Sequence, residues 1–352
     1  MIERRADAAI NASVKAGLII LALLYAAALL AEFIAPYNYR EQTRAEPSAP
    51  AAMIRFTDVN GNFHLRPFIY RSRLTNPRDL EYTEDASREY PLAFFVRGVP
   101  YDLVWLVRSD IHLFGVWGND GETAPQVHLL GTDQLGRDRF SRLVVAMRFS
   151  LLVSPVGTIL ACIIGIIFGA LSGYSRKGID TAMMGVADTV IALPTLILIL
   201  AARAAFPLEL PPWRAATLLI SIFALTGWAE MARLTRGQVV SVRDLEFITA
   251  ASALGARQTR ILSAHVLPNI AGPLLVQATL ILPAFFLAEV ALSFLGVGLQ
   301  DPEPSLGNML TSASDLTQLA EHPVLLLSPA AVIFLFVFAT RLLSRGRRAS
   351  VV

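Results

Sequence analysis

The chain has 352 residues, of which 54% are hydrophobic and only 16% are charged, and its mean hydropathy is +0.53. This apolar fraction is too high for an ordinary soluble domain and is typical of an integral membrane protein. The formal net charge of +2 excludes little, because the placement of charge matters more than its sum in a membrane protein.

Six apolar segments are long enough to cross a bilayer core of about 30 Å, which takes about 20 helical residues. They are residues 16–35, 149–171, 183–206, 213–229, 270–295 and 324–343. The first is longer than the apolar region of a signal peptide, and no clear cleavage site follows before Pro36. We therefore interpret it as a retained span and predict an all-α integral membrane fold with six transmembrane helices.

Basic residues set the expected orientation of these spans. The short loops 207–212 and 296–323 contain no lysine or arginine. The segments on the opposite side hold Arg4, Arg5, Lys15, Arg176, Lys177, Arg233, Arg236, Arg243, Arg257, Arg260, Arg341, Arg345, Arg347 and Arg348. This positive-inside asymmetry predicts that both chain ends are cytoplasmic.

A long polar segment, residues 36–128, separates the first two predicted spans on the outer side. Its stretch "IRFTDVNGNFHLRPFIY" indicates two strands around Asn60-Gly61, a favoured hairpin turn. One interpretation is a small extracytoplasmic subdomain with β structure. The other is a long loop packed over the outer face.

The second span has an amphipathic approach and a row of glycines. Residues 131–148 show helical apolar spacing, which predicts a surface helix capped by Thr132 or Asp133. This helix is either part of an outer gate or a structural lead-in to the span. The small residues within the span are Gly157, Gly165, Gly169 and Gly173. Such a row allows close helix packing, and we expect a partner subunit as the neighbour.

Ionisable residues inside membrane spans are costly, so each needs an explanation. Asp188 is expected to make an interhelical hydrogen bond or a contact at a cytoplasmic elbow. Pro194 is expected to kink the third span, as suits a gate. Glu289 either lines a translocation path or pairs with Arg203 or Arg214 near the outer surface, and we favour the ion pair. Asp188, Pro194 and Glu289 are thus the candidate path or gate residues.

Residues 244–268 form a basic, half-apolar stretch between the fourth and fifth spans. Apolar residues recur with helical spacing on each side of Gly255. Gly255 can adopt left-handed geometry and end a first helix, and Pro268 is expected to end a second. Such a helix pair either lies against lipid headgroups or fits into a groove of another protein. The break at its middle favours the groove.

Three separated motifs resemble the dipeptide/oligopeptide/nickel permease group of ABC importers, and within it the second, C-type permease. They are "GTDQLGRDRFSRLVVAMRFSLL" (131–152), "FITAASALGARQTRILSAHVLPN" (247–269) and "ALSFLGVGLQDPEPSLGNML" (291–310). The middle motif is similar to the family's EAA loop. The resemblance covers about residues 129–343 and the first span. The sequence departs from the family in having Phe247 for a common tyrosine and Ser252 for a common arginine.

The resemblance implies a type I importer permease whose EAA loop docks on an ATPase subunit. The ATPase-coupling residues carried over are Ala250, Ala251, Leu254, Gly255, Ala256, Ile261, Leu267 and Pro268. The implied partners are a homologous second permease, two ATPase subunits and an extracytoplasmic substrate-binding protein. The chain would work in the lipid bilayer of a bacterial inner membrane, without nucleic acid. ATP and magnesium would be bound by the ATPase subunits.

The resemblance divides the chain into 1–35 (cytoplasmic N-terminus and first span), 36–128 (extracytoplasmic insertion), 129–343 (permease domain with coupling loop 244–268) and 344–352 (cytoplasmic tail). It implies alternating-access import of di- or oligopeptides. A permease for nickel or another small solute is the rival within this family.

The residues themselves exclude several chemistries. No phosphate-binding G-x-x-x-x-G-K-[ST] loop is present, so we predict no ATPase site in this chain. The five histidines are scattered without ligand spacing, and Cys162 is the single cysteine, so neither a metal site, a disulfide nor a catalytic constellation is expected. An ATP-independent secondary transporter is the alternative from another class, and its inverted repeat is not seen.

Overall fold

The computed structural model describes residues 2–103, 106–116, 124–207, 209–311 and 323–349. It divides into two compact units, described here one at a time. The first contains Met1–Ala22, Ser150–Gly298 and Ile333–Val352, and the second contains Leu23–Phe149 and Leu299–Val332. The domain boundaries predicted at residues 35, 128 and 343 stay predictions.

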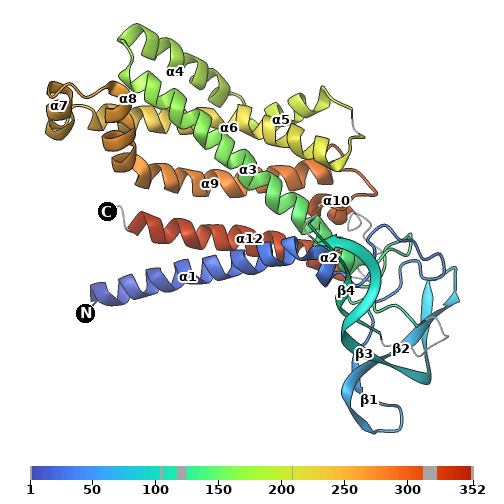
Figure 1. Cartoon of the computed structure of the whole chain (residues 1–352). Helices are drawn as coiled ribbons and strands as arrows, with labels where there is room; N and C mark the ends of the chain where they lie inside the picture. The colour runs from blue at the N-terminus through green and yellow to red at the C-terminus, as the bar shows by residue number, and fades with distance from the viewer. Residues whose placement is uncertain (1, 104–105, 117–123, 208, 312–322, 350–352) are drawn as a thin grey trace. The chain divides into compact units, whose positions relative to one another are not determined.

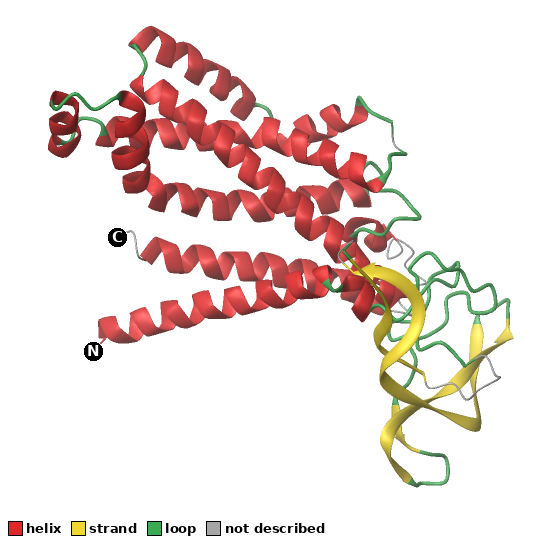
Figure 2. Cartoon of the chain, in the orientation of Figure 1, coloured by secondary structure: helices red, strands yellow, loops and turns green. Residues whose placement is uncertain are grey.

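The first unit is helical (Figures 1 and 2). It contains the N-terminal part of α1 (Ile2–Leu29), most of α3 (Arg139–Tyr174) and the C-terminal part of α12 (Val324–Ala349). The elements that lie wholly within it are α4 (Lys177–Ala192), α5 (Thr195–Ala204), α6 (Pro212–Val242), α7 (Glu246–Ala253), α8 (Gln258–Ile261), a π-helical turn (Leu262–Val266) and α9 (Leu267–Phe294). Large apolar side chains stay exposed on these helices, among them Ile167, Leu225 and Phe334. Apolar outer surfaces of this kind are expected where helices face lipid.

Most of the predicted spans are present as single long helices. Five described helices are long and apolar enough to cross a membrane, and a bent pair, α4 with α5, gives a sixth if it counts as one span. The third predicted span, residues 183–206, is therefore not one kinked helix. Its two parts are bent by 85° at the break around Pro194.

The chain breaks at Pro194 because of the residue before it. Leu193 has φ −88° and ψ 134°, the extended geometry that proline imposes on its predecessor. Pro194 itself lacks an N–H and starts the next helix as its N-cap. The sequence thus located the irregularity at Pro194 correctly. It predicted a kink within one helix, whereas the structure has a bend of 85° between two helices.

The glycine row of α3 packs against α6 of the same chain, not against a partner subunit as expected. A Cβ atom on Gly169 would lie 2.2 Å from the Ala232 carbonyl oxygen, and one on Gly165 would lie 2.5 Å from that of Trp228. Only residues without a side chain allow helix backbones this close. The glycines therefore set the α3–α6 distance.

The prediction that Pro268 ends the second coupling helix was wrong, because the helix continues through it into α9. The turn before it is π-helical, with the Leu267 N–H bonded to the Leu262 carbonyl five residues earlier. This wider turn accommodates the proline, which lacks a donor and would crowd a regular turn. The Asn269 side chain adds a hydrogen bond across this segment, donating to the His265 carbonyl at 2.5 Å.

The second unit holds the β structure expected between residues 36 and 128, so the chain is not all-α (Figure 2). Its sheet has the order β1-β2-β3-β4, entirely antiparallel. Its elements are α2 (Ala31–Ile34), β1 (Arg55–Thr57), β2 (Phe63–Asn76), β3 (Glu81–Leu103), β4 (Val107–Val116) and α10 (Leu306–Thr311). The hairpin predicted at Asn60-Gly61 joins β1 to β2, and Gly61 has φ +84°.

The start of α3 differs from the predicted amphipathic helix. Residues 131–138 form turns, and the helix begins only at Arg139. The cap is Asp138, whose carboxylate accepts the Ser141 backbone N–H at 2.7 Å. Thr132 is used elsewhere, since its hydroxyl accepts from the Ala49 N–H and donates to the Glu46 carbonyl.

His128 ties these turns together inside the second unit. Its Nδ1 lies 2.9 Å from Asp138 Oδ1 and its Nε2 lies 3.0 Å from Glu46 Oε2. Burial alone would lower the pKa of His128, but the hydrogen bonds to Asp138 and Glu46 outweigh it and raise the pKa to about 9.

The raised pKa predicts that alkaline pH weakens this region. Protonated His128 stabilises the folded chain through its two carboxylate partners. This contribution is complete below the ordinary histidine pKa of about 6.5 and is lost as pH rises through the folded pKa of about 9. We expect a loss of roughly 3 kcal/mol in the free energy of unfolding across this window. Thermal unfolding of the whole chain between pH 6 and pH 10 measures it. The unfolding midpoint of the His128→Gln variant should depend less on pH than that of the wild type. The same pH dependence in both chains would contradict the prediction.

Candidate functional site

A tight turn separates the two short helices predicted on the cytoplasmic side. After α7, the Ala256 N–H bonds to the Ala251 carbonyl at 3.1 Å and the Gly255 N–H bonds to the Ser252 carbonyl at 3.0 Å. This pair of bonds is the Schellman motif, whose C′ residue is left-handed. Gly255 occupies that position with φ +83°, as the sequence predicted.

The turn presents apolar side chains to the surroundings. Leu254 is 89% exposed and Phe247 is 46% exposed, and Ala250 lies exposed on α7 between them in sequence. Ala251 and Ala256 are half-buried. We refer to Phe247, Ala250 and Leu254 as the apolar tip. An exposed apolar surface of this kind is typical of a site that another protein or a membrane covers.

Other predicted coupling residues hold the tip in place. Ile261 is 2% exposed and anchors α8, and Ile248, which was not among the predicted residues, is 3% exposed and anchors α7. Leu267 is half-buried and Pro268 is exposed at the start of α9. Of the eight predicted residues, only Ile261 is therefore fully buried. Ala250, Leu254 and Gly255 are exposed around the turn, and Pro268 is exposed at the start of α9.

A pocket of about 430 Å³ lies between α5, α6 and α9 in the first unit. Its lining is mostly apolar, with polar groups from each helix. The lining polar residues are Thr195, Thr226, Glu230 and Gln277. Gln277 Nε2 donates to Glu230 Oε2 at 3.3 Å, which joins α9 to α6. Pockets with few polar groups on an apolar wall are the usual form of small-ligand sites.

The sequence did not point to this pocket. Glu230 follows the fourth predicted span by one residue, and Gln277 is the lone amide within the fifth. These two side chains are 47 residues apart and meet only through the packing of α6 on α9. A charged residue directly at the end of a span was the one available signal.

The structure does not bring the three candidate path residues together at the pocket. Asp188 on α4 forms an ion pair with Arg233 on α6 at 2.8 Å, in line with an interhelical contact. Pro194 marks the break, and the pocket wall begins at the next residue, Thr195. Glu289 is absent from the pocket lining.

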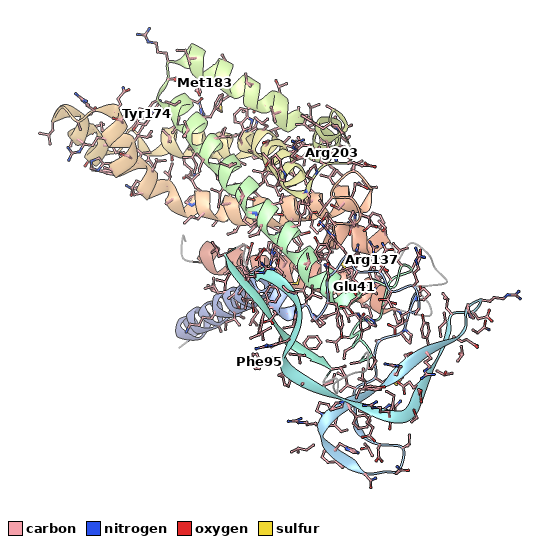
Figure 3. All side chains as sticks on the ribbon, turned by 45° about the vertical axis from the view of Figure 1, so that its right-hand side comes forward. Glu41, Phe95, Arg137, Tyr174, Met183 and Arg203 are labelled. Carbon is pink, nitrogen blue, oxygen red and sulfur yellow. The ribbon has the colours of Figure 1, made fainter. Side chains whose placement is uncertain are left out.

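Glu289 does not form the favoured ion pair in the described part of the chain. Its carboxylate is fully buried and accepts a hydrogen bond from Ser293 Oγ at 2.9 Å, with Ser150 beside it. Arg203, which Figure 3 labels, instead donates to the carbonyl oxygens of Phe206 and Pro207. Glu289 is thus part of the interior contact between α9 and α3.

This burial predicts a structural role for Glu289. Glu289→Gln keeps the side-chain shape and the acceptor for Ser293, so transport and thermal stability are expected to change little. Glu289→Ala removes the acceptor of the Ser293 hydroxyl hydrogen bond and opens a cavity, which costs about 2–4 kcal/mol. Uptake and thermal unfolding of both variants test this, and a Glu289→Gln chain that is stable but inactive would contradict it.

A further ion pair and two hydrogen bonds hold α4, α3 and α6 together. Asp180 at the start of α4 accepts from Arg236 at 2.5 Å and from Ser172 at 2.6 Å. Arg243 donates to the Gly173 carbonyl at 2.6 Å. The arrangement therefore offers a firmly tied helical scaffold with an apolar tip on one loop and a pocket among its helices.

Two family models match the chain. Residues 165–346 match "Binding-protein-dependent transport system inner membrane component", and residues 11–50 match "N-terminal TM domain of oligopeptide transport permease C". The first match covers more than half of the chain and contains both the tip and the pocket.

Individual proteins of known name are similar to this chain in sequence. The "Oligopeptide transport system permease protein OppC" of Bacillus subtilis (strain 168) is 36% identical over 63% of this chain and 70% of its own length. The "Dipeptide transport system permease protein DppC" of the same organism is 36% identical, over 62% of this chain and 66% of that protein. The corresponding "Di/tripeptide" protein of Pseudomonas aeruginosa (strain UCBPP-PA14) is 39% identical over 62% and 70%. A solved structure of the MetNI methionine ABC transporter aligns with a TM-score of 0.42 and 20% identity, over 58% of this chain and 95% of that chain.

Proposed function

The chain belongs to the family of binding-protein-dependent transport system inner membrane components, and from this membership we propose that it is one permease subunit of an ATP-driven importer of di- or oligopeptides. The relatives named above are peptide permeases, which supports the substrate class. The proposal includes a type I fold with six spans and both chain ends in the cytoplasm of a bacterial cell.

The observation that carries the proposal is the apolar tip on a rigid turn. Phe247, Ala250 and Leu254 are exposed, while Ile248 and Ile261 are buried behind them. A short amphipathic helix with a fixed end fits into a groove of a partner protein. In this proposal the groove belongs to an ATPase subunit, and two such subunits serve this chain and a homologous second permease.

Transport then follows from movement of the tip. ATP-driven closure of the two ATPase subunits brings the two coupling loops together, and α9 transmits this movement because α8 continues into it through the π-helical turn. The spans open outward to receive peptide from an extracytoplasmic binding protein, and ATP hydrolysis resets them. The α5–α6–α9 pocket is a candidate part of the path, since polar groups of three helices meet there.

Crosslinking in the assembled complex tests the proposal. A cysteine at Ala256 or Gln258, in a chain with Cys162 replaced by serine, should crosslink to an ATPase subunit. A cysteine at exposed Phe206, beyond α5, serves as the control and should not. Peptide-loaded binding protein should also stimulate ATP hydrolysis by the complex. Crosslinks to lipid alone from both tip positions would refute the importer reading.

A further inference from the structure

Three potential metal ligands converge in the β sheet of the second unit. They are Asp58 in the β1–β2 turn, His64 on β2 and Glu89 on β3, and their ligand atoms all lie within 4.8 Å of one another. His64 Nε2 lies 3.3 Å from Asp58 Oδ2 and 3.6 Å from Glu89 Oε2. We propose that these three side chains bind a divalent transition-metal ion, with Zn²⁺ as the preferred ion.

The spacing of the three groups suits a metal. Zinc binds imidazole nitrogen and carboxylate oxygen at about 2.0–2.2 Å, so two ligand atoms of a tetrahedral site lie about 3.4 Å apart. Both measured distances from His64 Nε2 are close to that value. Small rotations of the half-exposed Glu89 side chain bring its oxygen to the third corner.

Hydrogen bonding alone does not account for the convergence. One imidazole nitrogen faces two carboxylates, and it has at most one proton to donate. Within the described residues, neither Asp58 nor Glu89 forms an ion pair with lysine or arginine. Two carboxylates with a neutral imidazole carry a charge of −2, which a divalent cation neutralises.

Irregular strand pairing places two of the ligands. Arg55 pairs with Phe68 and Thr57 with Phe63, so residues 64–67, including His64, lie opposite Phe56 alone. Ile69 pairs with Tyr90 and Arg71 with Asp85, so residues 86–89, including Glu89, lie opposite Tyr70 alone. Such bulges redirect side chains and recur next to functional sites.

Asp58 has a turn function that does not occupy all of its carboxylate. Its Oδ1 accepts the backbone N–H groups of Asn60 and Asn62 at 2.9 and 2.8 Å. Its Oδ2, which accepts from the Asn62 side chain, is the oxygen that faces His64. The turn therefore fixes one ligand and the two bulges deliver the others. The fourth position of a tetrahedral ion would be open to water or to a partner's side chain.

Metal titration of the purified, tag-free full-length chain in detergent tests the proposal, after prior removal of metal by a chelator. We expect one Zn²⁺ per chain, an upward shift of the unfolding midpoint, and no displacement by excess Mg²⁺ or Ca²⁺. Co²⁺ should give the visible absorption of a tetrahedral site. Displacement by Ca²⁺ would overturn the transition-metal assignment, and absence of Zn²⁺ binding would overturn the site.

Variants identify the ligands. Glu89→Gln and His64→Gln should weaken Zn²⁺ binding by at least about 100-fold, beyond the 10–100-fold typical of outer-shell changes. Asp58→Asn keeps the acceptor for the turn N–H groups, so it separates loss of the ligand from loss of the turn. Glu81→Gln, the same change on an exposed position of β3, should bind like the wild type. Equal binding by all four variants would show that zinc is held elsewhere. The inference does not depend on the transported substrate.

Discussion

Replacing Gly169 with alanine is expected to force α3 away from α6 and to lower the free energy of unfolding by about 2–3 kcal/mol. The added Cβ would lie 2.2 Å from the Ala232 carbonyl oxygen and 2.8 Å from the Thr235 Cβ. The first contact is with helix backbone, which cannot rotate away as a side chain can. The two helices must therefore separate, and the neighbouring contact at Gly165 opens with them.

The midpoint of thermal unfolding in detergent measures this loss. Gly237 on α6 is the matched control, because a Cβ there meets no atom within 4 Å. In that open position alanine favours the helix by up to about 1 kcal/mol over glycine. Gly237→Ala should therefore be as stable as the wild type or slightly more so. Equal midpoints for Gly169→Ala and Gly237→Ala would disprove the role of the glycine row.

The glycine row shows which part of the fold can be predicted from sequence. Long apolar segments are a local property, so most spans were located correctly. The row itself indicated close packing, but its neighbour depends on tertiary structure and is α6 of the same chain. The sequence therefore indicated that a helix packs closely on this row, but it did not indicate which helix.

Local turn chemistry was predictable where a single residue decides it. Gly255 ends α7 as expected, because only a left-handed residue completes the Schellman motif. Pro268 was misjudged, since its effect depends on the π-helical turn before it and on the Asn269 side chain. The same reasoning placed the α3 cap at Thr132 or Asp133 instead of Asp138.

Sites made by distant residues were beyond sequence reasoning. Glu230 and Gln277 meet across two helices, and their separation of 47 residues follows no period. The five histidines, His64 included, show no metal-ligand spacing among themselves, so no metal site was predicted. Two strand bulges bring His64 to Asp58 and Glu89. Register shifts of this kind leave no repeat in the sequence.

Replacing Gly255 with valine is expected to abolish ATP-driven uptake while leaving membrane insertion normal. A Cβ at this position meets no atom within 4 Å, so the change acts through the backbone alone. Left-handed geometry costs an ordinary residue about 1–2 kcal/mol, and a β-branched residue is a marked outlier there. The eight-residue α7 is too short to be stable by itself, so losing its terminal turn releases the apolar tip.

Asparagine separates the backbone effect from the mere presence of a side chain, because it tolerates left-handed geometry. Gly255→Asn should therefore keep most of the uptake that Gly255→Val loses, with equal amounts of both chains in the membrane. Stimulation of ATP hydrolysis by peptide-loaded binding protein should follow the same order. Normal uptake by Gly255→Val would refute the turn's role. Equal loss of uptake in both variants would show that the turn accepts no side chain at residue 255. Left-handed geometry would then not be what the coupling requires.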